Sequence, residues 1–145
     1  MPKHRPLFVI ALLTLPLLFS TLASSAADSP AIKIERGDHI CYLGNTLADR
    51  MQHFGWLETL IYNRLPDQEL VFRDLGRAGD EINHRERTDG FGTPDEWLTR
   101  EKADVIFAFF GYNESFAGSK GLDKFKGELG KWVKETLSKN YSGRG

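Results

Sequence analysis

The chain has 145 residues, a formal net charge of −1, and hydrophobic and aromatic contents of 41% and 12%. Such a composition excludes a disordered chain, and the nearly balanced charge offers no basic surface to nucleic acid. A chain of this length holds one modest hydrophobic core, so we expect a single domain.

The first residues have the pattern of a secretory signal peptide. Basic residues precede an apolar run over residues 7–18, and small residues follow through Ala27. The run is shorter than the roughly 18 residues that cross a bilayer. We therefore expect a cleaved leader over residues 1–27 and a secreted or periplasmic domain over residues 28–145, with no membrane contact. Two of the 19 basic residues lie in the leader, which leaves 17 against 20 acidic ones and a net charge of −3.

The first strand and helix are predicted from apolar spacing. Residues 39–43 form a short apolar run closed by a glycine, which indicates a buried strand. This run contains Cys41, the single cysteine of the chain, so no internal disulfide forms. We expect a buried small hydrophobic residue there rather than a reactive thiol or an intermolecular bridge. Over residues 47–65 apolar positions recur every three or four residues until Pro66, which predicts one amphipathic helix.

Two further strands and two further helices follow. Residues 70–75 predict a strand that ends in a glycine-spaced loop. Thr93 is expected to cap a short helix that begins at Pro94 and carries acidic residues in its first turn. Residues 103–110 are almost continuously apolar, which is typical of a strand covered on both faces. A last amphipathic helix is predicted over about residues 122–140.

The alternation of strands and helices predicts an α/β fold with an open, parallel, three-layer α/β/α sheet. Each predicted strand ends in a polar loop with glycine, over residues 44–46, 76–79 and 111–114. The carboxyl ends of parallel strands meet at one edge of a sheet, which is where such folds bind ligands. We therefore expect the three loops to lie together.

These three loops resemble the first three sequence blocks of the SGNH hydrolases, also called the GDSL lipase/esterase family. Residues 44–47, Gly-Asn-Thr-Leu, resemble the Gly-Asp-Ser-Leu block, and Gly79 matches the oxyanion glycine of the second block. Residues 111–114, Gly-Tyr-Asn-Glu, resemble the Gly-x-Asn-Asp block. The resemblance covers nearly all of the domain and implies a flavodoxin-like sheet in which the first strand lies between the second and the third.

The resemblance also implies a role for each matching residue. Thr46 occupies the position of the nucleophile, Gly79 and Asn113 those of the oxyanion donors, and Asn45 and Glu114 lie nearby. Two positions depart from the family, because Asn45 and Thr46 stand where the motif has aspartate and serine. The late Asp-x-x-His block, which supplies the base in the family, is absent from this sequence.

The departures lead to an expectation about the extent of the chain. The family has strands beyond the third, so we expect this sequence to be the amino-terminal part of a larger domain, a truncated fragment with about three strands. The apolar strand over residues 105–110 then forms a bare sheet edge without charge or proline, which favours self-association.

The expected function is ester hydrolysis by the complete domain, with acylated carbohydrate as the favoured substrate and no activity of the fragment by itself. No metal and no cofactor are expected. The alternative is a non-catalytic module of the same fold that binds a carbohydrate or an acyl group. An unrelated phosphate-binding or flavodoxin-like domain ranks last, because the sequence has no Walker lysine loop and no Gly-x-Gly-x-x-Gly after a strand.

Structural interpretations of the same residues remain open. Thr46 also fits a helix N-cap, with Asp49 completing a capping box, and Asn45 tolerates a positive φ in the turn. Gly79 fits a tight turn without any oxyanion role. Asn113 fits a turn residue that bonds its own backbone.

The remaining polar candidates are three histidines and two acidic residues. His39, His53 and His84 have no metal-ligand spacing and are expected to be structural or surface residues. His84 is the one candidate for a substitute base. Asp80 and Glu114 are expected either to be solvated or to hold neighbouring loops.

Overall fold

The computed structural model describes residues 32–85 and 90–144. The predicted leader, residues 1–27, lies outside the described residues. Within them, no helix has both the length and the apolar character that a membrane crossing requires.

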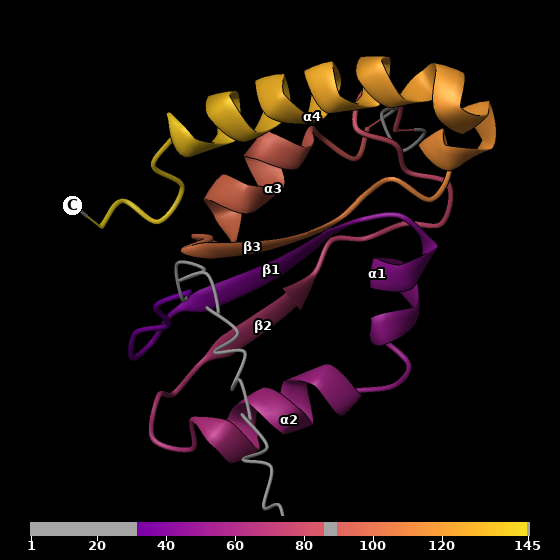
Figure 1. Cartoon of the computed structure of the whole chain (residues 1–145). Coiled ribbons are helices and arrows are strands. Elements are labelled where there is room, and N and C mark those ends of the chain that lie inside the picture. Colours follow the sequence, from indigo (N-terminus) through magenta and orange to yellow (C-terminus); the bar gives the residue numbers. More distant parts are fainter. Residues whose placement is uncertain (1–31, 86–89, 145) are drawn as a thin grey trace, which may run out of the picture. The chain divides into compact units, whose positions relative to one another are not determined.

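Three parallel strands form an open sheet in the order β2-β1-β3, as Figure 1 shows. They are β1 (His39–Gly44), β2 (Val71–Asp74) and β3 (Val105–Phe109). The register pairs His39 with Val71 and Ile40 with Val105. This arrangement confirms the predicted position of the first strand between the other two, and it confirms an α/β fold with a parallel sheet.

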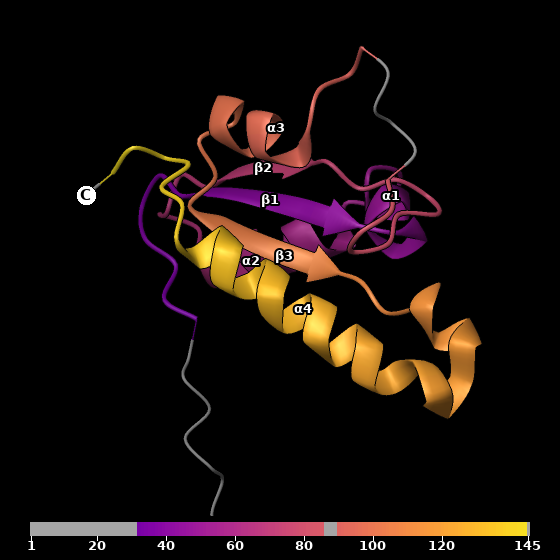
Figure 2. The same cartoon turned by 90° about the horizontal axis from the view of Figure 1, so that it is seen from above.

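Helices lie on both faces of the sheet (Figure 1). They are α1 (Thr46–Met51), α2 (Trp56–Arg64), α3 (Pro94–Arg100) and α4 (Leu122–Leu137), and the 3₁₀ segment η1 (Glu114–Gly121) precedes α4. Seen from above, α3 and α4 cover one face, and α4 runs along β3 (Figure 2). The helices α1 and α2 pack on the opposite face.

Alternate residues of β1 form the two halves of the core. Cys41 and Leu43 pack with Leu98 of α3 and Trp132 of α4, whereas Ile40 and Tyr42 belong to the core on the α1 and α2 side. Tyr42 is fully buried, with the rings of three phenylalanines at centroid distances of about 6 Å, namely Phe72, Phe107 and Phe109. Because β1 is covered on both faces, its sequence is continuously apolar.

Cys41 is a buried, free thiol, as predicted. Burial raises the pKa of this thiol to about 12, with a further contribution from the nearby carboxylate of Glu101. A thiol with such a pKa is protonated at neutral pH and behaves as a small hydrophobic side chain.

The prediction of one helix over residues 47–65 is wrong, because the chain forms two helices with a break between Met51 and Trp56. The amide of Phe54 bonds the carbonyl oxygen of Met51 at 3.1 Å, which tightens the last turn, and Gly55 (φ −43°, ψ 28°) then begins α2. A straight helix of 19 residues would extend about 28 Å, whereas the six residues of β1 extend about 20 Å. The break lets Met51 of α1 and Leu57 and Ile61 of α2 pack on the same core.

Gly44 ends β1 at a point where the backbone of β3 comes very close. Its φ is +131°, and a Cβ atom at this position would overlap the carbonyl oxygen of Phe109. The same carbonyl accepts the amide hydrogen of Asn45 at 3.0 Å. Glycine is therefore required both by the backbone angle and by the lack of space.

Residues after α4 are held against α3 by Asp95. The hydroxyl of Tyr141 donates to Asp95 Oδ1 at 2.6 Å, and the ammonium group of Lys139 pairs with Oδ2 of the same residue. Burial alone would raise the pKa of Asp95, but the hydrogen bonds from Lys139 and Tyr141 outweigh it and the pKa is lowered. Asp95 thus links the start of α3 to the segment that follows α4.

We predict that Gly44→Ala destabilises the domain by on the order of 3 kcal/mol or more, because both the positive φ and the contact with the β3 backbone are unfavourable to a side chain. Urea unfolding monitored by circular dichroism measures the difference. Gly127→Ala is the matched control, since Gly127 is exposed in α4 and has no atom within 4 Å of its Cβ position. This control should stabilise the domain by about 0.5–1 kcal/mol. Equal effects of the two substitutions would contradict the interpretation of Gly44.

A second prediction concerns acid stability. The lowered pKa of Asp95 means that its stabilising contribution is present above the ordinary carboxyl pKa of 3.8 and is lost as the pH falls through the lowered value. Asp95→Asn should therefore be less stable than the wild type at pH 7, by no more than about 1 kcal/mol because the site is half-exposed. The difference in urea midpoint should shrink as the pH falls below 4. A difference that stays constant down to pH 2 would contradict this assignment.

Candidate functional site

The turn after β1 positions the first candidate residues. Asn45 is buried, and its Oδ1 accepts the amide hydrogen of Leu47 at 3.2 Å, so that Asn45 caps α1. The expectation that Thr46 is the cap is wrong, since Thr46 is the first helical residue. The expected positive φ at Asn45 is also wrong, because its φ is −82° and Gly44 takes the left-handed conformation instead.

Thr46 is half-buried and lies at the rim of the sheet. Among the described residues, no side chain or backbone group forms a hydrogen bond with its hydroxyl. In that part of the chain, no histidine and no carboxylate accepts a hydrogen bond from Thr46 either. The hydroxyl is therefore available to a ligand, but no described group is bonded to it as a proton acceptor.

The second loop is held against the first by backbone contacts. The amide of Arg77 donates to the carbonyl oxygen of Gly44 at 2.9 Å. A Cβ atom at Gly76 would overlap the side chain of Ala48 in α1, so glycine is needed there for close approach. Gly79 has open space around it but a φ of +93°, which gives it a conformational role as well.

Asn113 joins the second loop to the third. Its Nδ2 donates to the carbonyl oxygen of Gly79 at 2.9 Å, instead of bonding its own backbone as one interpretation held. The amide group of asparagine has two N–H donors, and this bond uses one of them. Together with the bonds from Arg77 to Gly44 and from Asn45 to Phe109, it connects all three loops at one rim.

Glu114 holds the third loop and the segment after the second. One carboxylate oxygen accepts the amide hydrogen of Gly111 at 2.9 Å, and the other accepts that of Ile82 at 3.0 Å. Of the two interpretations of Glu114, the structure supports the one in which it holds neighbouring loops. Asp80 is 3% exposed, so it is not solvated either.

A groove lies beside Thr46, with a volume of about 570 Å³. Its lining consists of Asn45, Thr46, Leu47, Ala108, Phe109, Phe110 and Tyr112. Gly79 and Asn113 do not line it. The structure thus brings Gly79 and Asn113 together, and it places Thr46 and Asn45 on a groove at the open side of β3.

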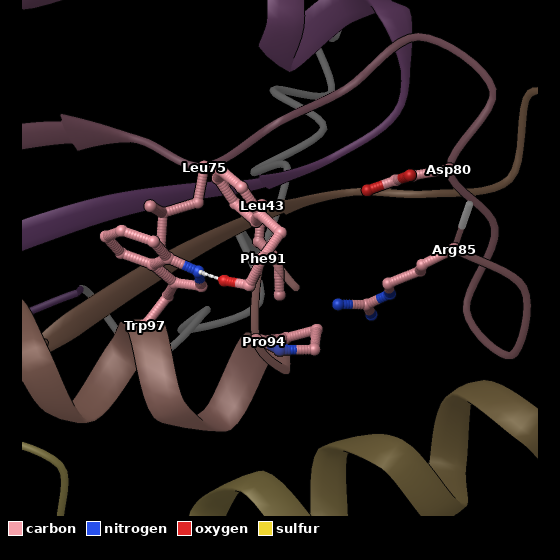
Figure 3. Close-up of a pocket in the computed structure, with 8 residues that line it drawn as sticks. Leu43, Leu75, Asp80, Arg85, Phe91, Pro94 and Trp97 are labelled. Carbon is pink, nitrogen blue, oxygen red and sulfur yellow. Dashed lines mark hydrogen bonds between the residues drawn. The ribbon is translucent and has the colours of Figure 1, made fainter. Parts of the chain in front are cut away.

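A second, much smaller cavity of about 40 Å³ lies under the loop that precedes α3 (Figure 3). Asp80 and Arg85 flank it, and Trp97 donates its indole N–H to the carbonyl oxygen of Phe91 at 2.6 Å. The rings of Phe91 and Trp97 stack at a centroid distance of 4.9 Å. This volume has room for a few water molecules but not for a substrate.

The histidines do not form a site with Thr46. His39 begins β1 and its Nδ1 lies 2.6 Å from the carbonyl oxygen of Glu101, at the other end of the strand from Thr46. His53 contacts the ring of Phe54. His84, the candidate for a substitute base, accepts a hydrogen bond from Glu81 through its backbone carbonyl. Over residues 32–85 and 90–144, no three His, Cys, Asp or Glu side chains are arranged to hold a metal ion.

The apolar side chains of the groove are the residues that sequence reasoning missed. Leu47 and Tyr112 are 58% and 63% exposed although both are large and apolar or aromatic. Their position directly after β1 and β3 was the available signal, because residues after parallel strands lie at the ligand-binding edge.

We predict that Glu114→Gln destabilises the domain by about 1–3 kcal/mol. The substitution replaces one acceptor oxygen by an NH₂ group, so that either the amide of Gly111 or that of Ile82 loses its partner. Hydrogen exchange of these two amides, followed by NMR, should be faster in the variant. Glu128→Gln in α4 is a control that keeps both bonds, and equal exchange rates in the two variants would contradict the role of Glu114.

A comparison of the chain with protein-family models, with curated proteins and with solved structures finds no match in any of the three.

Proposed function

We propose that this chain is an SGNH-type ester hydrolase domain, secreted or periplasmic, with Thr46 at the position of the nucleophile. Gly79 and Asn113 are proposed to bind the oxyanion, and the substrate is an acyl ester of a small molecule or a carbohydrate. The observation that carries the proposal is the hydrogen bond of 2.9 Å between Asn113 Nδ2 and the Gly79 carbonyl oxygen. It ties together the two loops that supply oxyanion donors in the family that the sequence resembles.

The chemistry required of these groups is nucleophilic acyl transfer. The hydroxyl oxygen of Thr46 would attack the ester carbonyl carbon, and N–H donors would stabilise the negative charge that develops on the carbonyl oxygen. The amide of Gly79 and the second N–H of Asn113 form no hydrogen bond within the described part of the chain, so both are available as donors.

A general base is the missing component. A threonine hydroxyl is a weak nucleophile at neutral pH, and the members of a catalytic triad act as a unit. None of the described histidines or carboxylates forms a hydrogen bond with the Thr46 hydroxyl. We therefore expect the chain to bind esters without hydrolysing them at a rate above that of the free reaction in buffer.

The alternative function is a binding module without chemistry. Two observations favour it. One N–H of Asn113 already donates to the carbonyl oxygen of Gly79, and no described group accepts a hydrogen bond from the Thr46 hydroxyl. In that case the same rim binds an acyl group or a sugar through hydrogen bonds and never forms a covalent intermediate.

Acyl transfer to residue 46 in the presence of added imidazole distinguishes the two functions. Imidazole can accept the proton that the chain has no group to accept, while 4-nitrophenyl acetate supplies the acetyl group and releases 4-nitrophenolate. We predict that Thr46 becomes acetylated, and that Thr46→Ser is acetylated roughly tenfold faster because serine lacks the methyl group that restricts the attack. Peptide mass spectrometry locates the acetyl group.

Thr46→Val is the control, because valine keeps the shape of threonine and removes the hydroxyl. It should show no acetylation at position 46 at any imidazole concentration. If residue 46 is acetylated in neither the wild type nor Thr46→Ser, the hydrolase proposal fails and the binding module becomes the better account.

A further inference from the structure

The groove beside Thr46 has walls of one chemical kind. Apart from Asn45 and Thr46, its lining consists of apolar or aromatic residues, namely Leu47, Ala108, Phe109, Phe110 and Tyr112. The ring of Tyr112 also contacts that of Phe116 at a centroid distance of 5.4 Å, which extends the aromatic surface outward. The walls are therefore aliphatic and aromatic.

Two side chains of the groove lining, together with Phe116 beside them, are unusually exposed for apolar or aromatic residues. Leu47, Tyr112 and Phe116 are 58%, 63% and 77% exposed. Single exposed apolar residues are ordinary, but several that gather around one hollow indicate a surface that binds something apolar. Such a ligand would cover the walls of the groove and remove them from water.

The polar part of the groove is small and uncharged. No Lys, Arg, Asp or Glu is among its lining residues. The Oδ1 atom of Asn45 accepts the amide hydrogen of Leu47, so the polar side-chain groups that remain in the lining are the Asn45 NH₂ group and the hydroxyls of Thr46 and Tyr112. A sugar would bring more hydroxyls than these three groups can pair, and each unpaired hydroxyl in contact with the apolar walls carries a cost.

A very short acyl group would fill only a small part of the groove. Its volume of about 570 Å³ lies within the range of about 300–1,000 Å³ that is usual for small-molecule sites. An acetyl group is only about as large as two water molecules, each of which takes about 30 Å³. Acetyl would leave most of the apolar wall in contact with water.

We propose that the groove binds the acyl side of the ester, and that this acyl group is a neutral hydrocarbon chain several carbons longer than acetyl, with octanoyl as its representative. The inference rests on the proposed function, because it assigns the polar end of the ligand to Thr46. It narrows the expectation of an acylated carbohydrate, since the acyl chain of the ligand and not a sugar occupies the groove.

Binding of uncleavable ligands tests the inference without any turnover. The probes are the N-methylamides of acetic, butanoic and octanoic acid, titrated into the full chain and followed by NMR shifts of groove residues. We expect the N-methylamide of octanoic acid (called octanamide below) to bind roughly tenfold or more tightly than that of acetic acid (called acetamide below), because each buried methylene adds to the affinity. Tyr112→Ala should weaken octanamide binding about fivefold and leave acetamide binding unchanged, whereas Tyr112→Phe should bind as the wild type does.

Phe54→Ala is the matched control, since Phe54 is 60% exposed and lies outside the groove lining. Equal affinity of the three amides for the wild type would overturn the inference, and so would equal effects of Tyr112→Ala and Phe54→Ala. These outcomes are independent of acetylation at residue 46. A chain that is acetylated there but shows no preference for length retains the proposed function and loses only the assigned substrate class.

Discussion

The close approach of β1 and β3 at their carboxyl ends is the constraint on which the rest of the rim depends. The two backbones come so near at Gly44 that no side chain fits against the Phe109 carbonyl. This contact directs the amide of Asn45 to that carbonyl and leaves the carbonyl of Gly44 to bind the amide of Arg77. The first turn, the end of β3 and the second loop are therefore positioned by one glycine and two backbone hydrogen bonds, and Thr46 follows from them.

The polar side chains of the rim divide into those that hold loops and those that remain free. Asn45 caps α1, Glu114 bonds two backbone amides, and Asn113 bonds the carbonyl of Gly79. These bonds keep the loops together, but the donors and acceptors in them are then not free to bond a substrate, as those of a catalytic site would be. Thr46 is the member of the group whose hydroxyl is uncommitted among the described residues. Under the proposed function, such a site is better equipped to bind an ester than to cleave it, since binding requires no proton acceptor and cleavage does.

The open side of β3 explains why the groove beside Thr46 is apolar. In the described sheet, β3 pairs with β1 alone, so its outer edge and the residues that follow it border the groove instead of another strand. Phe110 and Tyr112 belong to this continuation of an apolar strand, and Leu47 meets them from α1. An edge of this kind is normally protected from other chains by charge or by a covering element. Here the same exposed apolar surface lies next to the Thr46 hydroxyl, which relates the architecture of the sheet to the class of ligand that we propose.

The sequence by itself determined the element types, the parallel sheet, the burial of Cys41 and the meeting of three loops at one rim, whereas the strand order was implied only by the resemblance to a known family. Apolar periodicity and glycine positions carry that information, because they reflect local backbone preferences and the face that each residue must bury. Tertiary structure decided the break before α2, since only the length of the sheet shows that one continuous helix would overrun it. It also decided that Asn45 and not Thr46 caps α1, because the amide of Asn45 is held by the carbonyl oxygen of Phe109 in β3. The bond of Asn113 to Gly79 likewise joins segments far apart in the chain. The apolar groove at Thr46 has the same origin, since it exists only where the edge of β3 meets the first turn of α1.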